Sequence, residues 1–343
     1  MEKLQFASDY MEGAHPRILE RLLETNLEKT AGYGGDPYTE RARQKIREAA
    51  EAPEAEVYFL AGGTQTNAVV ITSLLRPWQG VVAADSGHIS VHEAGAIEAG
   101  GHKVFTVPNR EGKLSAGEVR ELLQRYESDE NRDHMVEPGM VYISQPTESG
   151  TLYSLEELKE LSGVCRRHGV FLYVDGARLA YALACPENDV SLPDLARLTD
   201  LFYIGGTKCG ALFGEAVVIP KPGLIPRFFT LIKQRGALLA KGRIAGIQFE
   251  TLFTGELYQQ IGERAICAAD RIRRALKEKG YEFAFDSPTN QIFVALTPEQ
   301  RARLAEKAEL SFWEIRPDGR TVMRIATSWA TEEEDVDRLI GLL

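Results

Sequence analysis

Several features that would narrow the class of this protein are scarce or missing. Cysteine is rare, and the four residues are Cys165, Cys185, Cys209 and Cys267. None belongs to a Cys-x-x-Cys pair or is spaced from a histidine as in a zinc site. No apolar run is long enough to cross a bilayer, and the first residues lack the apolar stretch of a signal peptide. The sequence therefore predicts no metal site, no disulfide framework, no membrane insertion and a cytoplasmic location.

Positive charge is also in deficit. The chain has 40 Lys and Arg residues against 50 Asp and Glu, a formal net charge of −10. Such a field repels nucleic acids and anionic membranes, so neither is expected as a partner, and an anionic ligand needs a local basic pocket. With 343 residues, of which 44% are hydrophobic, the chain is long enough for one large globular domain and a smaller one.

The middle of the chain alternates short apolar runs with amphipathic stretches, a pattern typical of parallel βαβ units. One unit has a strand at 141–144, a helix that begins with a capping box at Ser154 and ends at Gly169, and a fully apolar strand at 170–174. Further strands are expected at 57–60, 81–82, 201–204 and 216–219. This order predicts an α/β fold with a large, mostly parallel sheet.

The C-terminal part follows a different order. A long helix is expected at 258–279, followed by strands at 291–296 and 322–327 and by a capped helix from Thr331. This order is typical of a small α+β domain. The sequence thus predicts three parts, which are an N-terminal segment of residues 1–14, a large domain of residues 15–250 and a small domain of residues 251–343.

Two ionisable side chains follow strands that are expected to lie side by side. Asp175 comes directly after the strand at 170–174, and Lys208 lies in a glycine-rich segment after the strand at 201–204. Taken singly, Asp175 is as well explained by a helix N-cap and Lys208 by a surface turn. Together they suit pyridoxal phosphate, because a desolvated lysine forms an imine with an aldehyde and a carboxylate keeps the pyridine nitrogen protonated.

Two further segments belong to the same hypothesis. The sequence Ala-Gly-Gly-Thr-Gln-Thr-Asn at 61–67 precedes an expected helix at 68–75, and glycines before a helix N-terminus present N–H groups to a phosphate. The segment is neither Gly-x-Gly-x-x-Gly nor a Walker A loop, which argues against nicotinamide and nucleoside triphosphate ligands. His88 suits stacking on a cofactor ring or proton exchange, or else a hydrogen-bonded place within a loop. No role is assigned to His15, His92, His102, His134 or His168.

The order and spacing of these motifs resemble the low-specificity threonine aldolases of the β-eliminating lyase family. That family has the fold type I of pyridoxal-phosphate enzymes, like aspartate aminotransferase. The motifs that carry the resemblance are Ser8-Asp9, Tyr33-Gly-Gly-Asp36, Gly62-Gly-Thr64, His88 with Glu93, Asp175-Gly-Ala-Arg178, Thr207-Lys208 and Arg324-Ile-Ala-Thr-Ser328. The resemblance covers nearly the whole chain.

The resemblance implies a role for each of these motifs. Lys208 would hold pyridoxal phosphate as a Schiff base, Asp175 would pair with the pyridine nitrogen, and His88 would stack on the ring. The remaining cofactor-binding residues would be Gly63, Thr64, Gln65, Arg178 and Arg243, of which Arg243 would reach in from a neighbouring subunit. The residues that would bind the substrate are Ser8, Tyr33, Arg178 and Arg324, with Tyr33 at the mouth of the pocket.

Two positions depart from the family pattern. Glu148 occupies the place where better-known members carry a histidine close to the substrate hydroxyl, and Cys209 replaces a more usual Gly or Asn. The cofactor assignment is unaffected by these changes. The catalytic base, however, is expected to be either Glu148 or His88.

The reaction implied by the resemblance is that of a carbon–carbon lyase. It would cleave L-threonine, L-allo-threonine and related β-hydroxy-α-amino acids to glycine and an aldehyde. A β-eliminating lyase or a racemase acting on another amino acid is the main alternative, because the cofactor permits cleavage of several bonds to Cα. An aminotransferase matches the motifs less well, and a catalytically silent binding protein would lack the cofactor's colour. We expect a homodimer or a homotetramer, since active sites of fold type I are shared between subunits.

Overall fold

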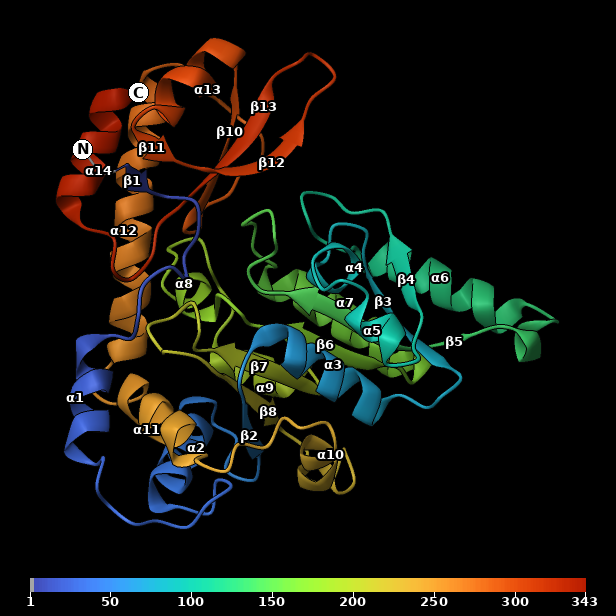
Figure 1. Ribbon diagram of the computed structural model, residues 1–343. Helices are drawn as coiled ribbons and strands as arrows, with labels where there is room; N and C mark the ends of the chain where they lie inside the picture. Colours follow the sequence, from blue (N-terminus) through green and yellow to red (C-terminus); the bar gives the residue numbers. More distant parts are fainter. Residues whose placement is uncertain (1–2) are drawn as a thin grey trace.

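The computed structural model describes residues 3–343, and its centre is a seven-stranded sheet (Figure 1). In spatial order the strands are β2 (Glu56–Leu60), β8 (Glu215–Ile219), β7 (Leu201–Gly205), β6 (Phe171–Asp175), β5 (Glu137–Ser144), β3 (Gln79–Ala84) and β4 (Val104–Val107). Strand β8 is antiparallel to both of its neighbours, and the other pairs are parallel. The mostly parallel sheet confirms the predicted α/β class.

Helices cover both faces of this sheet. One face is covered by α1 (Pro16–Glu24), α2 (Pro37–Ala49), α6 (Ala116–Ser128), α7 (Leu155–His168), α9 (Leu192–Leu198) and α11 (Arg243–Leu252). The other is covered by α3 (Gly63–Leu74), α4 (His88–Val91), α5 (Ala96–Ala99) and α10 (Phe228–Gln234). The residues of β6 before Asp175 are apolar because both faces of the strand are buried. Leu172 and Val174 lie in one core and Tyr173 lies in the other.

Local sequence signals define the helix that precedes β6. The Ser154 hydroxyl accepts a hydrogen bond from the backbone N–H of Glu157, and the Glu157 carboxylate accepts one from the Ser154 N–H. The helix ends at Gly169, whose φ of 68° lies in the left-handed region that glycine adopts without strain. Both helix limits predicted from the sequence are confirmed here.

A second, smaller sheet lies in the C-terminal part of the chain. Its four strands, in order, are β12 (Ser311–Ile315), β13 (Thr321–Ala326), β10 (Gln291–Leu296) and β9 (Glu282–Phe283). The helices beside it are α12 (Leu257–Glu278), α13 (Pro298–Ala305) and α14 (Glu333–Leu342). Strand β1 (Leu4–Gln5) pairs with β11 (Ala308–Glu309), so that the start of the described chain lies in the C-terminal part of the molecule (Figure 1).

Helix α12 connects the two parts. Leu257 and Ile261 at its start belong to the core beneath the large sheet, whereas Ile272 and Leu276 belong to the core of the small sheet. The boundary expected at residue 250 stays a prediction. Among residues 3–343, no helix has the length and apolar character needed to cross a bilayer.

Candidate active site

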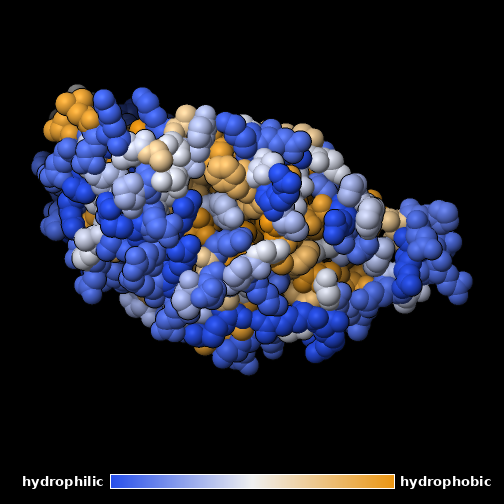
Figure 2. All heavy atoms as spheres, turned by 90° about the horizontal axis from the view of Figure 1, so that it is seen from below, coloured by the Kyte–Doolittle hydropathy of each residue, from blue (hydrophilic) through white to orange (hydrophobic). Residues whose placement is uncertain are grey.

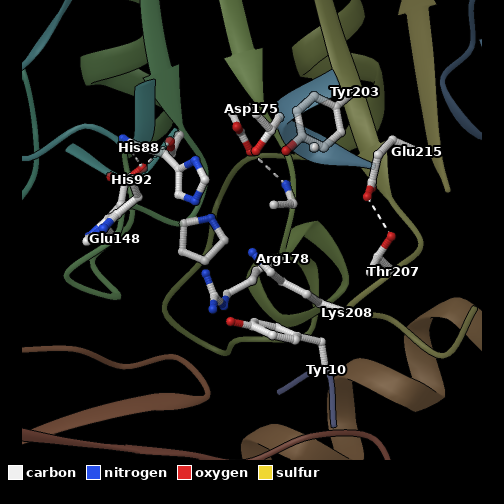
Figure 3. A pocket seen from close by; sticks show the side chains of 15 residues that line it. Tyr10, His88, His92, Glu148, Asp175, Arg178, Tyr203, Thr207, Lys208 and Glu215 are labelled. Carbon is white, nitrogen blue, oxygen red and sulfur yellow. Dashed lines mark hydrogen bonds between the residues drawn. The ribbon is translucent and has the colours of Figure 1, made fainter. Parts of the chain in front are cut away.

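A cavity of about 320 Å³ opens at the ends of β6 and β7 (Figure 3). Asp175 is the last residue of β6, and Lys208 lies in the loop that follows the neighbouring strand β7. The carboxyl ends of parallel strands in open α/β sheets are where ligands bind. Both side chains line this cavity together with His88, Glu148 and Arg178. The structure thus brings together residues that lie far apart in the sequence.

Lys208 presents a buried amine to the cavity. Its Nζ lies 5.7 Å from the centre of the Tyr10 ring, and it forms no ion pair with any residue in the described range. Burial, and to a lesser extent the positive charge of Arg178, lowers the pKa of Lys208. A lowered pKa favours the neutral amine, which is the form that attacks an aldehyde.

Asp175 is held as a carboxylate by its hydrogen bonds. Its Oδ2 accepts from the Tyr142 hydroxyl at 2.6 Å and from the Asn67 amide at 3.1 Å, and its Oδ1 accepts from the Ala177 N–H at 2.9 Å. Burial by itself would raise the pKa of Asp175, but nearby His88 and these hydrogen bonds lower the pKa overall. Asp175 therefore offers a permanent negative charge to the cavity.

The ring of His88 is fixed by a second carboxylate. Its Nδ1 lies 2.8 Å from the buried Glu93 carboxylate, which also accepts a hydrogen bond from Asn67 at 2.7 Å. Because Glu93 Oε1 accepts this hydrogen bond, Nδ1 carries a proton, and Nε2 forms no hydrogen bond with any residue in the range 3–343. Asn67 thus joins the residues that hold His88 to those that hold Asp175.

Glu148 lies beside His88 and is almost fully buried. Its Oε1 accepts hydrogen bonds from the backbone N–H of His88 at 2.9 Å and from the Ser144 hydroxyl at 2.8 Å. Burial raises the pKa of Glu148, and the Ser144 hydrogen bond opposes this only in part. Both hydrogen bonds use Oε1, so Oε2 is available to a ligand.

The glycine-rich segment forms the first turn of α3. The sequence predicts a helix that begins at Ala68. The helix in fact begins at Gly63, because residues 63–67 already have the helical backbone conformation. Its N-cap is Gly62, which supplies no side-chain hydrogen bond, so the first N–H groups of the helix have no side-chain cap, and Gly63 and Thr64 of this turn line the cavity. Gln65 turns back, and its Oε1 accepts from the Ala61 N–H at 3.1 Å. An uncapped helix N-terminus suits a phosphate.

These observations test whether the site fits pyridoxal phosphate. A buried amine of lowered pKa, an ionised carboxylate and a helix N-terminus without a side-chain cap line one cavity. They correspond to the aldehyde, the pyridine nitrogen and the phosphate of that cofactor. The residues present therefore fit it.

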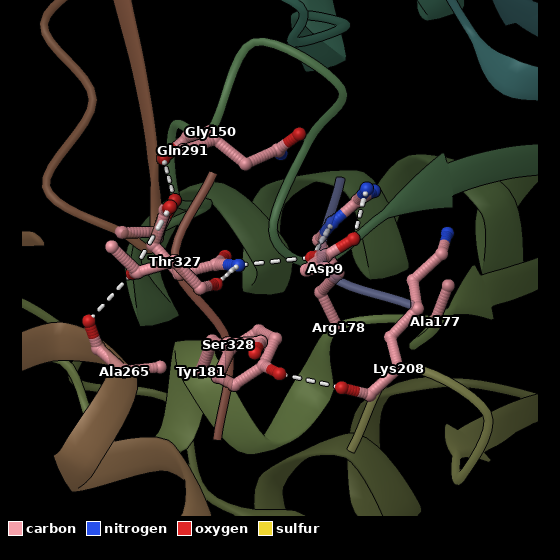
Figure 4. A network of polar contacts seen from close by, with 12 residues as sticks. Asp9, Gly150, Ala177, Arg178, Tyr181, Lys208, Ala265, Gln291, Thr327 and Ser328 are labelled. Carbon is pink, nitrogen blue, oxygen red and sulfur yellow. Dashed lines mark hydrogen bonds and ion pairs between the residues drawn. The ribbon is translucent and has the colours of Figure 1, made fainter. Parts of the chain in front are cut away.

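Arg178 forms an ion pair with Asp9, a residue to which no role was assigned from the sequence. Its Nε and Nη2 donate to the two oxygens of buried Asp9 at 2.6 and 2.9 Å, and Asn290 donates to the same carboxylate at 2.9 Å (Figure 4). Burial alone would raise the pKa of Asp9, but Arg178 lowers that pKa to about 2. Asp9 therefore fixes the guanidinium in place beside the cavity.

Within residues 3–343, Arg324 and Ser8 each have a buried polar atom that forms no hydrogen bond. Arg324 donates from Nη1 to Gln291 Oε1 at 3.0 Å and from Nη2 to the Ala7 carbonyl at 2.9 Å, and it has no carboxylate partner among residues 3–343. The Nε of Arg324 and the Oγ of Ser8 are buried without a hydrogen bond within the same range. Unpaired buried donors are costly, so these atoms are suited to an incoming anionic group.

Arg243 and Tyr33 are predicted site residues that lie away from this cavity. Arg243 donates from Nη1 to the Glu28 carbonyl at 2.6 Å, and the Lys233 amine lies 4.2 Å from the centre of the half-exposed Tyr33 ring. Neither Arg243 nor Tyr33 lines the cavity. The expectation that Tyr33 lies at the mouth of the pocket is therefore not met within one chain, because the loop that carries it packs against residues near Gly242.

The cavity also contains residues that the sequence analysis missed. They are Tyr10, His92, Tyr203 and Glu215. Glu215 accepts hydrogen bonds from the Thr207 hydroxyl at 2.7 Å and the Gly206 N–H at 3.1 Å, and burial raises its pKa. Glu215 could have been found because it is a charged residue at the start of the apolar strand at 215–219. His92 could have been found from the His-x-x-x-His spacing that it forms with His88.

Fold and site together define the class of the protein as a pyridoxal-phosphate enzyme of fold type I. The solved structure of aspartate aminotransferase from Thermus thermophilus has the same fold, with a TM-score of 0.73 at 18% identity over 99% of this chain and 91% of that one. The family model for beta-eliminating lyase matches residues 5–307, and the chain belongs to that family.

Two relatives are similar over nearly their whole length. A solved structure of Leishmania major threonine aldolase is 45% identical, has a TM-score of 0.95 and covers 98% of each chain. The low specificity L-threonine aldolase of Pseudomonas sp. (strain NCIMB 10558) is 29% identical over 341 residues, which are 98% of this chain and 95% of the relative.

Proposed function

We propose that the chain is a pyridoxal-phosphate-dependent aldolase that cleaves L-threonine, L-allo-threonine and related β-hydroxy-α-amino acids to glycine and an aldehyde. The observation that carries the proposal is the placement of Lys208 and Asp175 on one cavity at the ends of neighbouring strands. The names of the two full-length relatives support the choice of substrate.

Three groups of residues would hold the cofactor. Lys208 supplies the amine, Asp175 keeps a proton on the pyridine nitrogen, and the N–H groups at Gly63 and Thr64 bind the phosphate. When bound, pyridoxal phosphate supplies a ring that accepts electron density from the Cα of an amino acid. Asp175 would raise the rate because its fixed charge favours that electron flow.

The substrate carboxylate is assigned to the guanidinium groups. Within residues 3–343, Arg324 offers an unpaired Nε, and Ser8, which follows the Ala7 carbonyl that Arg324 Nη2 contacts, offers an unpaired hydroxyl. Arg178 is oriented by Asp9 and adds positive charge on the same side of the cavity. Binding there orients the amino acid with its amino group towards Lys208.

The proton of the β-hydroxyl is assigned to one of two acceptors. Nε2 of His88 is free because Nδ1 is held by Glu93, and Oε2 of Glu148 is free because Oε1 accepts both hydrogen bonds. The raised pKa of Glu148 makes it a stronger base than an ordinary carboxylate. Glu148→Gln and His88→Asn, measured singly for cleavage of threonine, identify the base. Unchanged cleavage in both variants would exclude both residues.

A direct assay tests the proposed reaction. Purified protein is incubated with L-threonine, L-allo-threonine and L-phenylserine, and glycine and the corresponding aldehyde are measured, with Lys208→Ala as the control. We expect equal amounts of glycine and aldehyde. Ammonia with a keto acid would instead favour a β-eliminating lyase, and formation of the diastereomer inverted at Cα, such as D-allo-threonine from L-threonine, without cleavage would favour a racemase.

We further propose that two chains form each active site. Arg243 and Tyr33 lie away from the cavity of their own chain, beside exposed apolar side chains such as Leu23, Leu27 and Phe229. Figure 2 views the molecule from below, where hydrophobic residues gather in the central region and hydrophilic residues surround them. A homodimer, or a tetramer of dimers, brings Arg243 of one chain to the phosphate of another.

Mixing two inactive variants tests the shared site. Lys208→Ala and Arg243→Ala proteins are unfolded together and refolded as a mixture. In a mixed dimer, one site combines an intact Lys208 with an intact Arg243, so activity should return. Activity no higher than the sum of the separate variants would place Arg243 in a site of its own chain or outside any site.

We also propose a cytoplasmic location. The four cysteines are free thiols, and three of them are buried. Free thiols are the stable form of cysteine in a reducing compartment. Cell fractionation with an antibody against the protein is the appropriate test.

A further inference from the structure

A second hollow of about 540 Å³ adjoins the cofactor cavity. It shares Lys208, Arg178 and His92 with that cavity, and its opposite wall is formed by Phe312 and Trp313 of β12. The hollow therefore lies between the two sheets and opens directly onto the reacting amine.

An irregularity in β12 shapes this wall. Phe312 pairs with Met323 and Glu314 pairs with Val322, so Trp313 is an extra residue without a partner on β13. In a regular strand, consecutive side chains point to opposite faces of the sheet. A bulge breaks that alternation and redirects a side chain, and here both Phe312 and Trp313 line the hollow.

The indole of Trp313 is held between the two parts of the molecule. On the small sheet it meets Phe293 edge-on with ring centres 4.8 Å apart, and Phe285 lies behind at 6.5 Å. On the other side the His92 ring lies 6.2 Å away. These contacts fix the orientation of the indole before any ligand arrives.

The hollow is also lined by the residues assigned to the amino group and the carboxylate of the substrate. Lys208 and Arg324 line it together with Trp313 and His92, so the β-substituent of an amino acid held by Lys208 and Arg324 would lie within reach of the indole. A methyl group, as in threonine, is too small to cover this wall. A planar aromatic group can make the offset or edge-on contacts that aromatic side chains favour.

We propose that Trp313 is a specificity-determining residue that, with His92, selects β-hydroxy-α-amino acids with a planar aromatic β-substituent over those with a methyl group. This inference rests on the proposed aldolase function. Trp313 acts on substrate choice alone and takes no part in moving a proton.

The test compares the kcat/KM ratio of L-phenylserine to L-threonine in four proteins. Trp313→Ala should lower this ratio about tenfold relative to the unmodified enzyme, mainly through the KM of phenylserine. Trp313→Phe keeps an aromatic ring and should retain most of the preference. Ile315→Ala, an exposed residue of the same strand that does not line the hollow, is the matched control and should leave the ratio unchanged.

The outcomes separate the two proposals. If the unmodified protein cleaves neither substrate, the aldolase function fails. If it cleaves both and Trp313→Ala leaves the ratio within twofold although its melting temperature is normal, the specificity role of Trp313 is overturned. If Trp313→Ala does not fold, Trp313→Phe and Trp313→Leu are compared, and an equal ratio in these two variants would equally overturn it.

Discussion

The two walls of the active-site cleft differ in the kind of polar atom that they leave without a partner. On the wall of the large sheet, Asp175 accepts three hydrogen bonds and Asn67 links it to Glu93, the carboxylate that holds His88, and the buried atom left unpaired there within residues 3–343 is an acceptor, Glu93 Oε2. On the wall of the small sheet, two donors, Arg324 Nε and Gln291 Nε2, are buried without partners in the described part of the chain. The first wall thus presents carboxylates that are already fixed by hydrogen bonds, whereas the second presents buried donors suited to an anionic group, as expected if the first holds the cofactor and the second the substrate.

Removal of the amine should have the largest effect on the wall of the large sheet. Lys208→Ala should lower the rate of threonine cleavage on the order of 10⁴-fold, because no other buried amine lines the cavity. Lys221→Ala, which changes an exposed lysine, is the control and should be fully active. A Lys208→Ala protein with more than a tenth of the normal rate would show that Lys208 has a structural role only.

Neutralising Asp175 should have the second-largest effect on the rate of cleavage. Asp175→Asn keeps the size of the side chain but removes the charge, and we expect kcat to fall on the order of 10³-fold. Rates are measured at saturating cofactor, and circular dichroism checks the fold. A normal kcat in a folded Asp175→Asn protein would contradict the role assigned to this carboxylate.

The wall of the small sheet should respond differently to substitution. Arg324→Ala should raise the KM for threonine roughly tenfold to a hundredfold and change kcat much less, because a charge-assisted contact to the substrate is lost. Arg324→Lys should recover part of the affinity. If kcat fell and KM stayed constant, Arg324 would belong with the catalytic wall, and the contrast between the walls would disappear.

The smallest predicted effect concerns stability at low pH. The pKa of Asp9 is about 2 in the folded chain against its ordinary value of 3.8, so its ion pair with Arg178 stabilises the fold above pH 4 and that contribution is lost as the pH falls through 2. The full loss amounts to about 2 kcal/mol in the free energy of unfolding. Urea unfolding at pH values from 5 down to 2 measures the loss, and Asp9→Asn should be less stable at pH 5 and less sensitive to pH. An equal pH dependence in both proteins would contradict this assignment.

The wall of the large sheet was largely predictable from the sequence. Asp175 and Lys208 each follow a short continuous apolar run, which indicates a strand covered on both faces whose end faces the crevice. The direction of β8 was not predictable, because an apolar run looks the same in a parallel or an antiparallel strand. The start of α3 at Gly63 was also missed, because glycine has a low intrinsic preference for helix.

The wall of the small sheet was predictable only in part. Arg324 was predicted as a substrate-binding residue from the family resemblance. Its contacts with Ala7 and Gln291, which leave Nε unpaired, are not indicated by any local sequence pattern. Asp9 and Arg178 are 169 residues apart, so their ion pair exists only in the folded chain. The bulge at Trp313 likewise depends on the register between two strands, which the composition of β12 does not reveal.

The central claim is that the amine of Lys208 bonds covalently to pyridoxal phosphate. The purified protein is treated with borohydride, digested, and the peptides are identified by mass spectrometry. The account predicts a single modified peptide that contains Lys208 and carries the mass of the reduced cofactor, with no such peptide from Lys208→Ala. Modification of a different lysine, or no modification in a protein saturated with the cofactor, would contradict it.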